Sequence, residues 1–178
     1  AKEYSEELLI NLFSVFHKGM PEQVYCRNSD KEMDSKALMV WHARALKIAS
    51  EEDLPEFSRD FLNNGFFREI ISLSQLSEGP QLAKEYLNNK GIHFVVLKHL
   101  QKTYLDGACF KSMDGVPVIG MTLRHDRLDN FWFTLAHELA HLYLHLDDDN
   151  RAFFDDTDNV PNPDDADCEP EADDFASE

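Results

Sequence analysis

The stretch FWFTLAHELAHLYLHL, residues 131–146, constrains this chain most, because it places three histidines four residues apart on an otherwise apolar strip. Its apolar residues recur at helical spacing, which predicts a helix from about Asn130 to Leu146 with Asp129 as the N-cap. Residues four apart lie on the same face of a helix, so His137 and His141 can converge on one point. Two converging imidazoles are typical ligands of a zinc ion.

Glu138 follows the first of these histidines, which completes the pattern HExxH. Beside the two ligands, a carboxylate can accept a proton from the attacking water and pass it to the leaving amine during peptide hydrolysis. The pattern therefore indicates a zinc-dependent hydrolase of peptide bonds. In the competing interpretation the histidines are ordinary polar residues of a half-buried helix, but the helical context favours a metal site.

A catalytic zinc also needs a third protein ligand and an open position. His145 lies two turns from the start of the histidine row, about 12 Å along the axis, so we expect a helix-end or outer-shell group rather than a ligand. No histidine follows it, which leaves an upstream histidine or a downstream carboxylate. Glu169 and Glu171 stand out among the carboxylates because EPEADDFASE, residues 169–178, has helical composition. The chemistry of the residues does not choose between these candidates.

The rest of the chain predicts an α+β protein. Apolar spacing and turn residues predict helices in 2–19, in 35–52, in 57–76 with a break at Asn-Asn-Gly, and in 80–91. After Gly91 the pattern changes to short apolar runs, which predict strands in 92–97, 107–112 and 116–123, the last two forming a hairpin around 113–115. Residues 147–168 are rich in Asp, Asn and Pro and predict a long loop before the final helix.

Charge is concentrated at the C-terminal end of the chain. Fourteen acids and one base from Asp147 to Glu178 carry −13 of the total charge of −17, which leaves −4 for the first 146 residues. Such a surface repels phosphates, so we expect no direct binding of nucleic acid by this chain. A solvated loop is the simplest interpretation of the acidic run, and mimicry of nucleic acid on a basic partner is the alternative.

The cysteines and the lengths of the apolar runs indicate the cellular compartment that we expect for this chain. Cys26, Cys109 and Cys168 are odd in number and widely spaced, which favours a reducing compartment and a cytoplasmic protein. There is no CxxC pair, so we do not expect a thiolate zinc site. No apolar run is long enough to cross a bilayer, and the polar, acidic N-terminus does not resemble a signal peptide. The absence of an initiator Met favours a processed product or a fragment.

Three segments resemble one known family. GIHFVVLKHLQKTYLDGACF, GVPVIGMTLRHDRLDNFWFTLAHELAHLYLH and EPEADDFA are similar to the ImmA/IrrE family of metallopeptidase-like domains, in particular to those fused to XRE-type helix-turn-helix regulators and near HigA-like antitoxins. The resemblance is dense over about 91–176. It implies a zincin-like core in which His137, His141 and Glu171 hold Zn²⁺ and Glu138 is the general base. Asp173 stands where the family often has Asn or Asp.

The resemblance also implies an organisation and a function. Residues 1–90 would form a mostly helical N-terminal region and 91–178 the zincin-like domain, with its last helix truncated. The implied activity is that of a zinc metallo-endopeptidase that acts on, or regulates, an intracellular transcriptional regulator. Its partners would be that protein and a fused or separate helix-turn-helix DNA-binding module. The alternative is a non-catalytic sensory or antitoxin-type protein-binding module of an XRE-family regulator.

Overall fold

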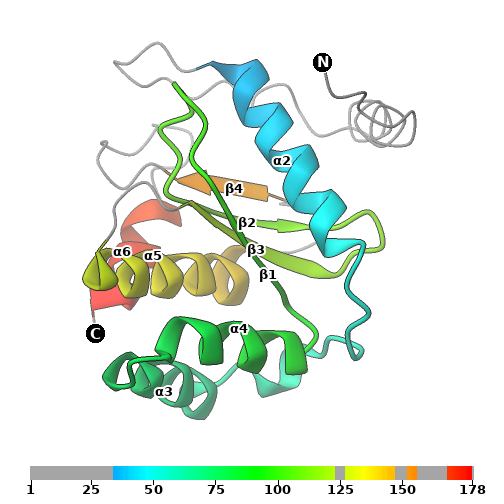
Figure 1. Cartoon of the computed structure of the whole chain (residues 1–178). Helices are drawn as coiled ribbons and strands as arrows, with labels where there is room; N and C mark the ends of the chain where they lie inside the picture. Colours follow the sequence, from blue (N-terminus) through cyan, green and yellow to red (C-terminus); the bar gives the residue numbers. More distant parts are fainter. Residues whose placement is uncertain (1–33, 123–126, 147–151, 156–167, 178) are drawn as a thin grey trace.

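A computed structural model describes residues 34–122, 127–146, 152–155 and 168–177. The helix predicted in 2–19 and most of the acidic run therefore lie outside the described residues. The described part is α+β, as predicted, and is built around one four-stranded sheet (Figure 1). Its strands are β1 (His93–Leu97), β2 (Gly107–Lys111), β3 (Pro117–Thr122) and β4 (Ala152–Asp155), in the order β1-β3-β2-β4. β1 runs parallel to β3, and β2 is antiparallel to both β3 and β4.

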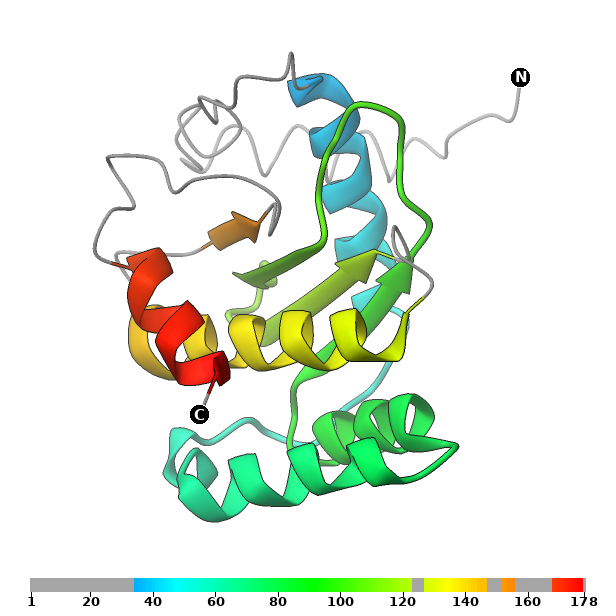
Figure 2. The ribbon, with the colours of Figure 1, turned by 90° about the vertical axis from the view of Figure 1, so that its left-hand side faces the viewer.

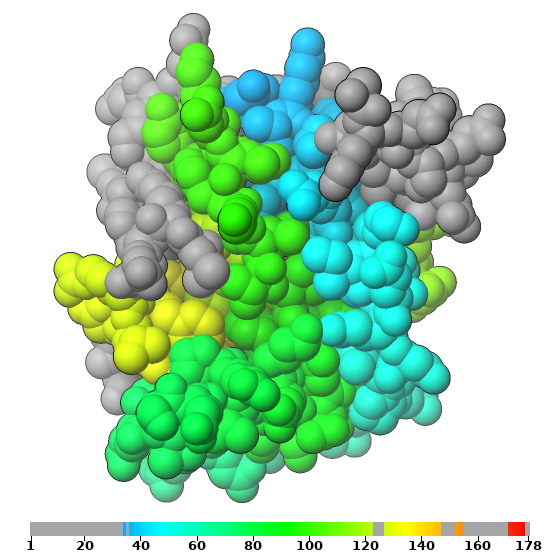
Figure 3. Space-filling model, in the orientation of Figure 1, coloured from blue at the N-terminus to red at the C-terminus, as the bar shows by residue number. Residues whose placement is uncertain are grey.

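Helices cover both faces of the sheet (Figures 1 and 2). α2 (Ser35–Ala49) lies on one face, and α5 (Leu128–Ala140), its π-helical continuation η4 (His141–His145) and α6 (Cys168–Ser177) lie on the other. α3 (Asn64–Ser72) and α4 (Gly79–Asn89), with the short 3-10 turns η2 (Arg59–Phe61) and η3 (Leu73–Gln75), pack beneath α5. In the space-filling view α2, the α3–α4 pair and α5 all reach the surface around the sheet (Figure 3).

The sheet separates two apolar cores because successive side chains of a strand point to opposite faces. In β1, Phe94 joins the core beneath α5, whereas Val95 joins the core beneath α2. Gly120 of β3 allows α2 to lie close to the sheet, since a Cβ there would stand 2.5 Å from Cη2 of the buried Trp41. The fold thus fixes α2 and α5 against the same strands from opposite sides.

Several predicted boundaries are confirmed. α2 begins at Ser35 because the Asp34 carboxylate accepts hydrogen bonds from the first backbone amides. The Asn-Asn-Gly break is real, since Asn63 caps α3 by accepting from the amides of Gly65 and Phe66 at 2.9 and 3.3 Å. Gly91 follows α4 with φ of +75°, a conformation that favours glycine. The hairpin of β2 and β3 is antiparallel, as predicted.

Two predictions near the histidine row are wrong. Asp129 is not the N-cap of α5, because the helix begins at Leu128 and Arg127 occupies the cap position. The Asp129 carboxylate instead lies in the first turn, where it accepts hydrogen bonds from Arg127 and from the amide of Asn130. The segment predicted as a continuous loop contains β4, whose four residues are too few for a periodic signal but pair with β2. No helix in the described ranges is both long and apolar enough to cross a membrane.

Candidate metal centre

His137 and His141 converge, as their spacing predicts. Both lie on the buried side of α5 and η4, with 2% and 0% of their surface exposed. Their Nε2 atoms face one another at 3.0 Å. Two imidazole nitrogens in such contact in a buried place require a proton or a cation between them, because two lone pairs would otherwise repel. A shared proton meets this requirement, and so does a divalent metal bound to both rings.

The outer nitrogens of both histidines have partners that leave Nε2 directed at the other ring. His137 Nδ1 lies 3.0 Å from Oδ1 of Asp173 on α6, so a ring protonated at Nδ1 donates to that carboxylate. His141 Nδ1 lies 3.2 Å from Nδ1 of His145, whose Nε2 lies 3.2 Å from Oε2 of Glu171. One consistent set of protons, on Nδ1 of the first two rings and Nε2 of the third, satisfies every one of these contacts.

The π-helical turn η4 explains why His145 contacts His141. The wider turn ends with the amide of Leu146 donating to the carbonyl of His141 at 2.8 Å. It brings His145 beside Nδ1 of His141, away from the contact between the Nε2 atoms of His137 and His141. Burial lowers the pKa of His145, and its hydrogen bond with Glu171 opposes that shift.

Arg59 holds the end of η4 and was missed by the reasoning from sequence. Its Nη1 donates to the carbonyl of Leu146 at 2.7 Å, and its Nη2 donates to the carbonyls of Leu142 and Tyr143 at 3.2 and 2.8 Å. The last carbonyls of a helix have no partner within it and attract cations. No local sequence signal connects an arginine to carbonyls more than 80 residues away.

Glu171 does not lie beside the Nε2 pair. Its carboxylate contacts His145, and its side chain is 65% exposed. Within the described ranges no three His, Cys, Asp or Glu side chains gather closely enough to hold a metal ion. The structure thus brings His137 and His141 together, whereas Glu171 contacts His145, the next histidine of the row. The side chain of Glu169 lies outside the described residues.

Glu138 points from α5 to the sheet and is fully buried. A Cβ on Gly107 of β2 would lie 2.1 Å from its Oε1, so only glycine leaves room for the carboxylate at this position. Thr134, one turn earlier on α5, lies against the same point. The need for Gly107 was also missed from sequence, because it arises from the packing of α5 on β2. The expected general base is therefore enclosed between helix and strand.

The match with a protein family begins just before β1 and extends through α6. The sequence model of the IrrE N-terminal-like domain, which defines a peptidase family, matches residues 89–178. The chain belongs to this family. This match confirms the resemblance to the ImmA/IrrE family. It also supports a metallopeptidase-like domain of the zincin type, with which the α+β fold is consistent. No curated protein and no solved structure gives a significant match.

Proposed function

We propose that the IrrE-like domain is a zinc-dependent endopeptidase that acts on, or regulates, an intracellular transcriptional regulator. The observation that supports this most is the contact between Nε2 of His137 and Nε2 of His141 at 3.0 Å. Outer partners direct both nitrogens to one point, which is how proteins orient histidine ligands of zinc.

His137 and His141 would hold the zinc ion, and Glu171 would be the third ligand if its carboxylate turned from His145 to the pair. Zinc, when bound, polarises a substrate carbonyl and activates water. Asp173 keeps the proton of His137 on Nδ1 and so fixes the orientation of that ring. Glu138 accepts a proton from the attacking water and donates it to the departing amine. The buried carboxylate of Glu138 occupies room that Gly107 leaves open.

The regulator target is inferred from the resemblance to regulator-fused domains. A helix-turn-helix module, in the same chain or a separate one, would supply DNA binding. The chain itself carries a net charge of −17, which supports a protein partner and opposes direct contact with nucleic acid.

Metal analysis and cleavage of a fluorogenic peptide library test the proposal together. Glu138→Gln should retain stoichiometric zinc and lose at least about a hundredfold in cleavage rate, because it removes the base but no ligand. If the Glu171 carboxylate is a ligand, Glu171→Ala should lose zinc at micromolar concentration. If the carboxylate only orients His145, the same variant should bind zinc only about tenfold more weakly than wild type. Cleavage by Glu138→Gln at the wild-type rate would disprove the mechanism.

A non-catalytic regulatory module is the second candidate, and one observation favours it. The carboxylate expected to meet water is 0% exposed, and it is enclosed by α5 and β2. In this case the domain binds metal and docks a regulator or toxin without turnover. Regulation would then survive Glu138→Gln, whereas the loss of regulation in that variant would support the peptidase.

A further inference from the structure

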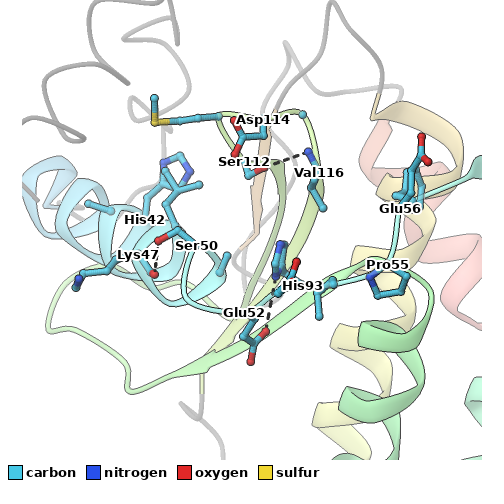
Figure 4. Close-up of a pocket in the computed structure, with 18 of the residues that line it drawn as sticks. His42, Lys47, Ser50, Glu52, Pro55, Glu56, His93, Ser112, Asp114 and Val116 are labelled. Atoms are coloured by element: carbon cyan, nitrogen blue, oxygen red, sulfur yellow. Dashed lines mark hydrogen bonds and ion pairs between the residues drawn. The ribbon is translucent and has the colours of Figure 1, made fainter. Parts of the chain in front are cut away.

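The face of the sheet opposite α5 carries a cavity of about 650 Å³ (Figure 4). It is bounded by α2, by residues 50 and 52–57, by the start of β1 and by the turn between β2 and β3. Its volume lies in the range of small-molecule sites in proteins. None of its lining residues belongs to α5, η4 or α6, so it is separate from the candidate metal centre.

His93 and Glu52 form a polar end of this cavity. His93 is 7% exposed, and its Nδ1 has no hydrogen-bond partner in the described part of the chain. The nearest carboxylate oxygen, Oε2 of Glu52, lies 3.7 Å away, beyond hydrogen-bond distance. Lys84 donates to Oε1 of Glu52 at 2.8 Å, and Asn88 donates to Oε2 at 3.4 Å. When neutral His93 carries its proton on Nε2, its Nδ1 is a second acceptor beside Oε2 of Glu52, and one donor group can contact both.

The charges around the cavity favour a cation. One lysine, Lys47, lines it, and that lysine pairs with Glu51 at 3.2 Å. Burial lowers the pKa of both lining histidines, that of His42 to about 3, so both are neutral at pH 7. The lining carboxylates are Glu52, which pairs with Lys84 at 2.8 Å, and Asp53, Glu56 and Asp114, so acidic groups outnumber basic ones even when Lys84 is counted.

Apolar side chains supply the remaining wall. Met39 and Leu46 belong to α2, Leu54 comes from the following segment, and Val116 immediately precedes β3. An apolar wall with a few convergent polar groups is the usual composition of a site for a small organic molecule. The donor that fits between a carboxylate and a neutral imidazole is an ammonium group.

We propose that this cavity binds a small organic amine, with its ammonium group between Glu52 and His93 and its apolar body against α2. Such a site would give the domain a ligand-binding function in addition to that of the metal centre. It does not depend on whether the domain is a peptidase.

A series of three compounds of similar shape tests the charge requirement on the full chain. Tyramine carries the ammonium group, 4-propylphenol replaces it with a methyl group, and 3-(4-hydroxyphenyl)propanoate replaces it with a carboxylate. Calorimetry should give binding of tyramine alone, and the amide NMR signals of Ser112 to Val116 should shift while those of α5 do not. Absence of tyramine binding at millimolar concentration, or equal binding of all three compounds, would overturn the proposal.

Matched variants test the position of the ammonium group. Glu52→Gln should weaken tyramine binding at least about tenfold, because a charged hydrogen bond is lost. Glu51→Gln removes the same charge from an exposed neighbour outside the cavity lining and should change affinity less than about twofold.

A third variant separates loss of the site from loss of the fold. Ala43→Leu adds volume within the cavity on the half-buried side of α2 and leaves the contacts of Glu52 with Lys84 and Asn88 unchanged. It should abolish tyramine binding without unfolding the protein in circular dichroism. Wild-type affinity in Ala43→Leu, or equal effects of Glu51→Gln and Glu52→Gln, would place the ligand elsewhere and refute the site.

Discussion

Two carboxylates of α6 have different partners although only one residue separates them. Asp173 contacts Nδ1 of His137, whereas Glu171 contacts Nε2 of His145. Residues two apart on a helix project in different directions, so α6 reaches both ends of the histidine row at once. The helix therefore sets the orientation of the outer two rings, and His145 sets that of His141 between them.

Asp173→Ala should weaken zinc binding about ten- to a hundredfold, because His137 would lose the acceptor that fixes its tautomer and ring orientation. Asp174→Ala is the matched control, since it removes the same charge from an exposed position of the same helix. Competition with a fluorescent zinc chelator measures both affinities. Equal losses in the two variants would show that only the overall charge of α6 matters.

The site could be predicted from sequence where it depends on local helical geometry. Spacing four residues apart was enough to place Nε2 of His137 and His141 together. The partners of Glu171 and the need for Gly107 depend on how α6 and β2 pack against α5, and no local pattern reports that packing. The assignment of Glu171 as a zinc ligand thus stays a prediction.

At the scale of elements, the π-helical end of the histidine helix and its anchor belong together. A π-turn leaves helix carbonyls poorly satisfied, and such turns occur frequently at functional sites. Arg59 donates to three carbonyls at this end, from a segment that precedes the family-matched region. The helical N-terminal part therefore supports the histidine row directly.

Arg59→Ala should lower the free energy of unfolding by about 1–3 kcal/mol, because three carbonyls lose a charged donor. Arg68→Ala is the control, since it removes an exposed arginine from α3. Urea denaturation measures the stability, and hydrogen exchange at the amide of Leu146 should accelerate only in Arg59→Ala. Unchanged exchange there would mean that η4 does not need this anchor.

Elements were predictable in proportion to their length and periodicity. α2 and α4 have apolar faces several turns long, and their predicted positions are confirmed. β4 is four residues long, so the apolar Phe153 and Phe154 gave no alternation to detect within an acidic segment. The start of α5 was misplaced by two residues because Asp129 is as favourable in a first turn as at an N-cap.

At the scale of the whole molecule, the sheet lies between two helices that carry candidate sites. The histidine row belongs to α5 and η4, and the cavity, which the buried His42 lines, lies beside α2. His42 packs edge-on against Phe110 of β2 and Phe154 of β4, at ring distances of 4.4 and 5.1 Å. His42 therefore joins α2 to β2 and β4 on this face of the sheet.

This burial predicts how stability depends on acid. Burial lowers the pKa of His42 from 6.5 to about 3, so the unfolded chain binds the proton first as the pH falls. The stabilisation is fully present above pH 6.5 and is lost between pH 6.5 and about 3, by up to about 1.4 kcal/mol per pH unit.

His42→Leu, which keeps a similar volume in α2, should therefore show a shallower loss of unfolding free energy than wild type between pH 6.5 and 4. Urea denaturation at each pH measures both slopes, and His93→Leu serves as a comparison because His93 is opposed by Glu52 and should contribute less. Parallel slopes in wild type and His42→Leu would show that folding does not lower the pKa of His42.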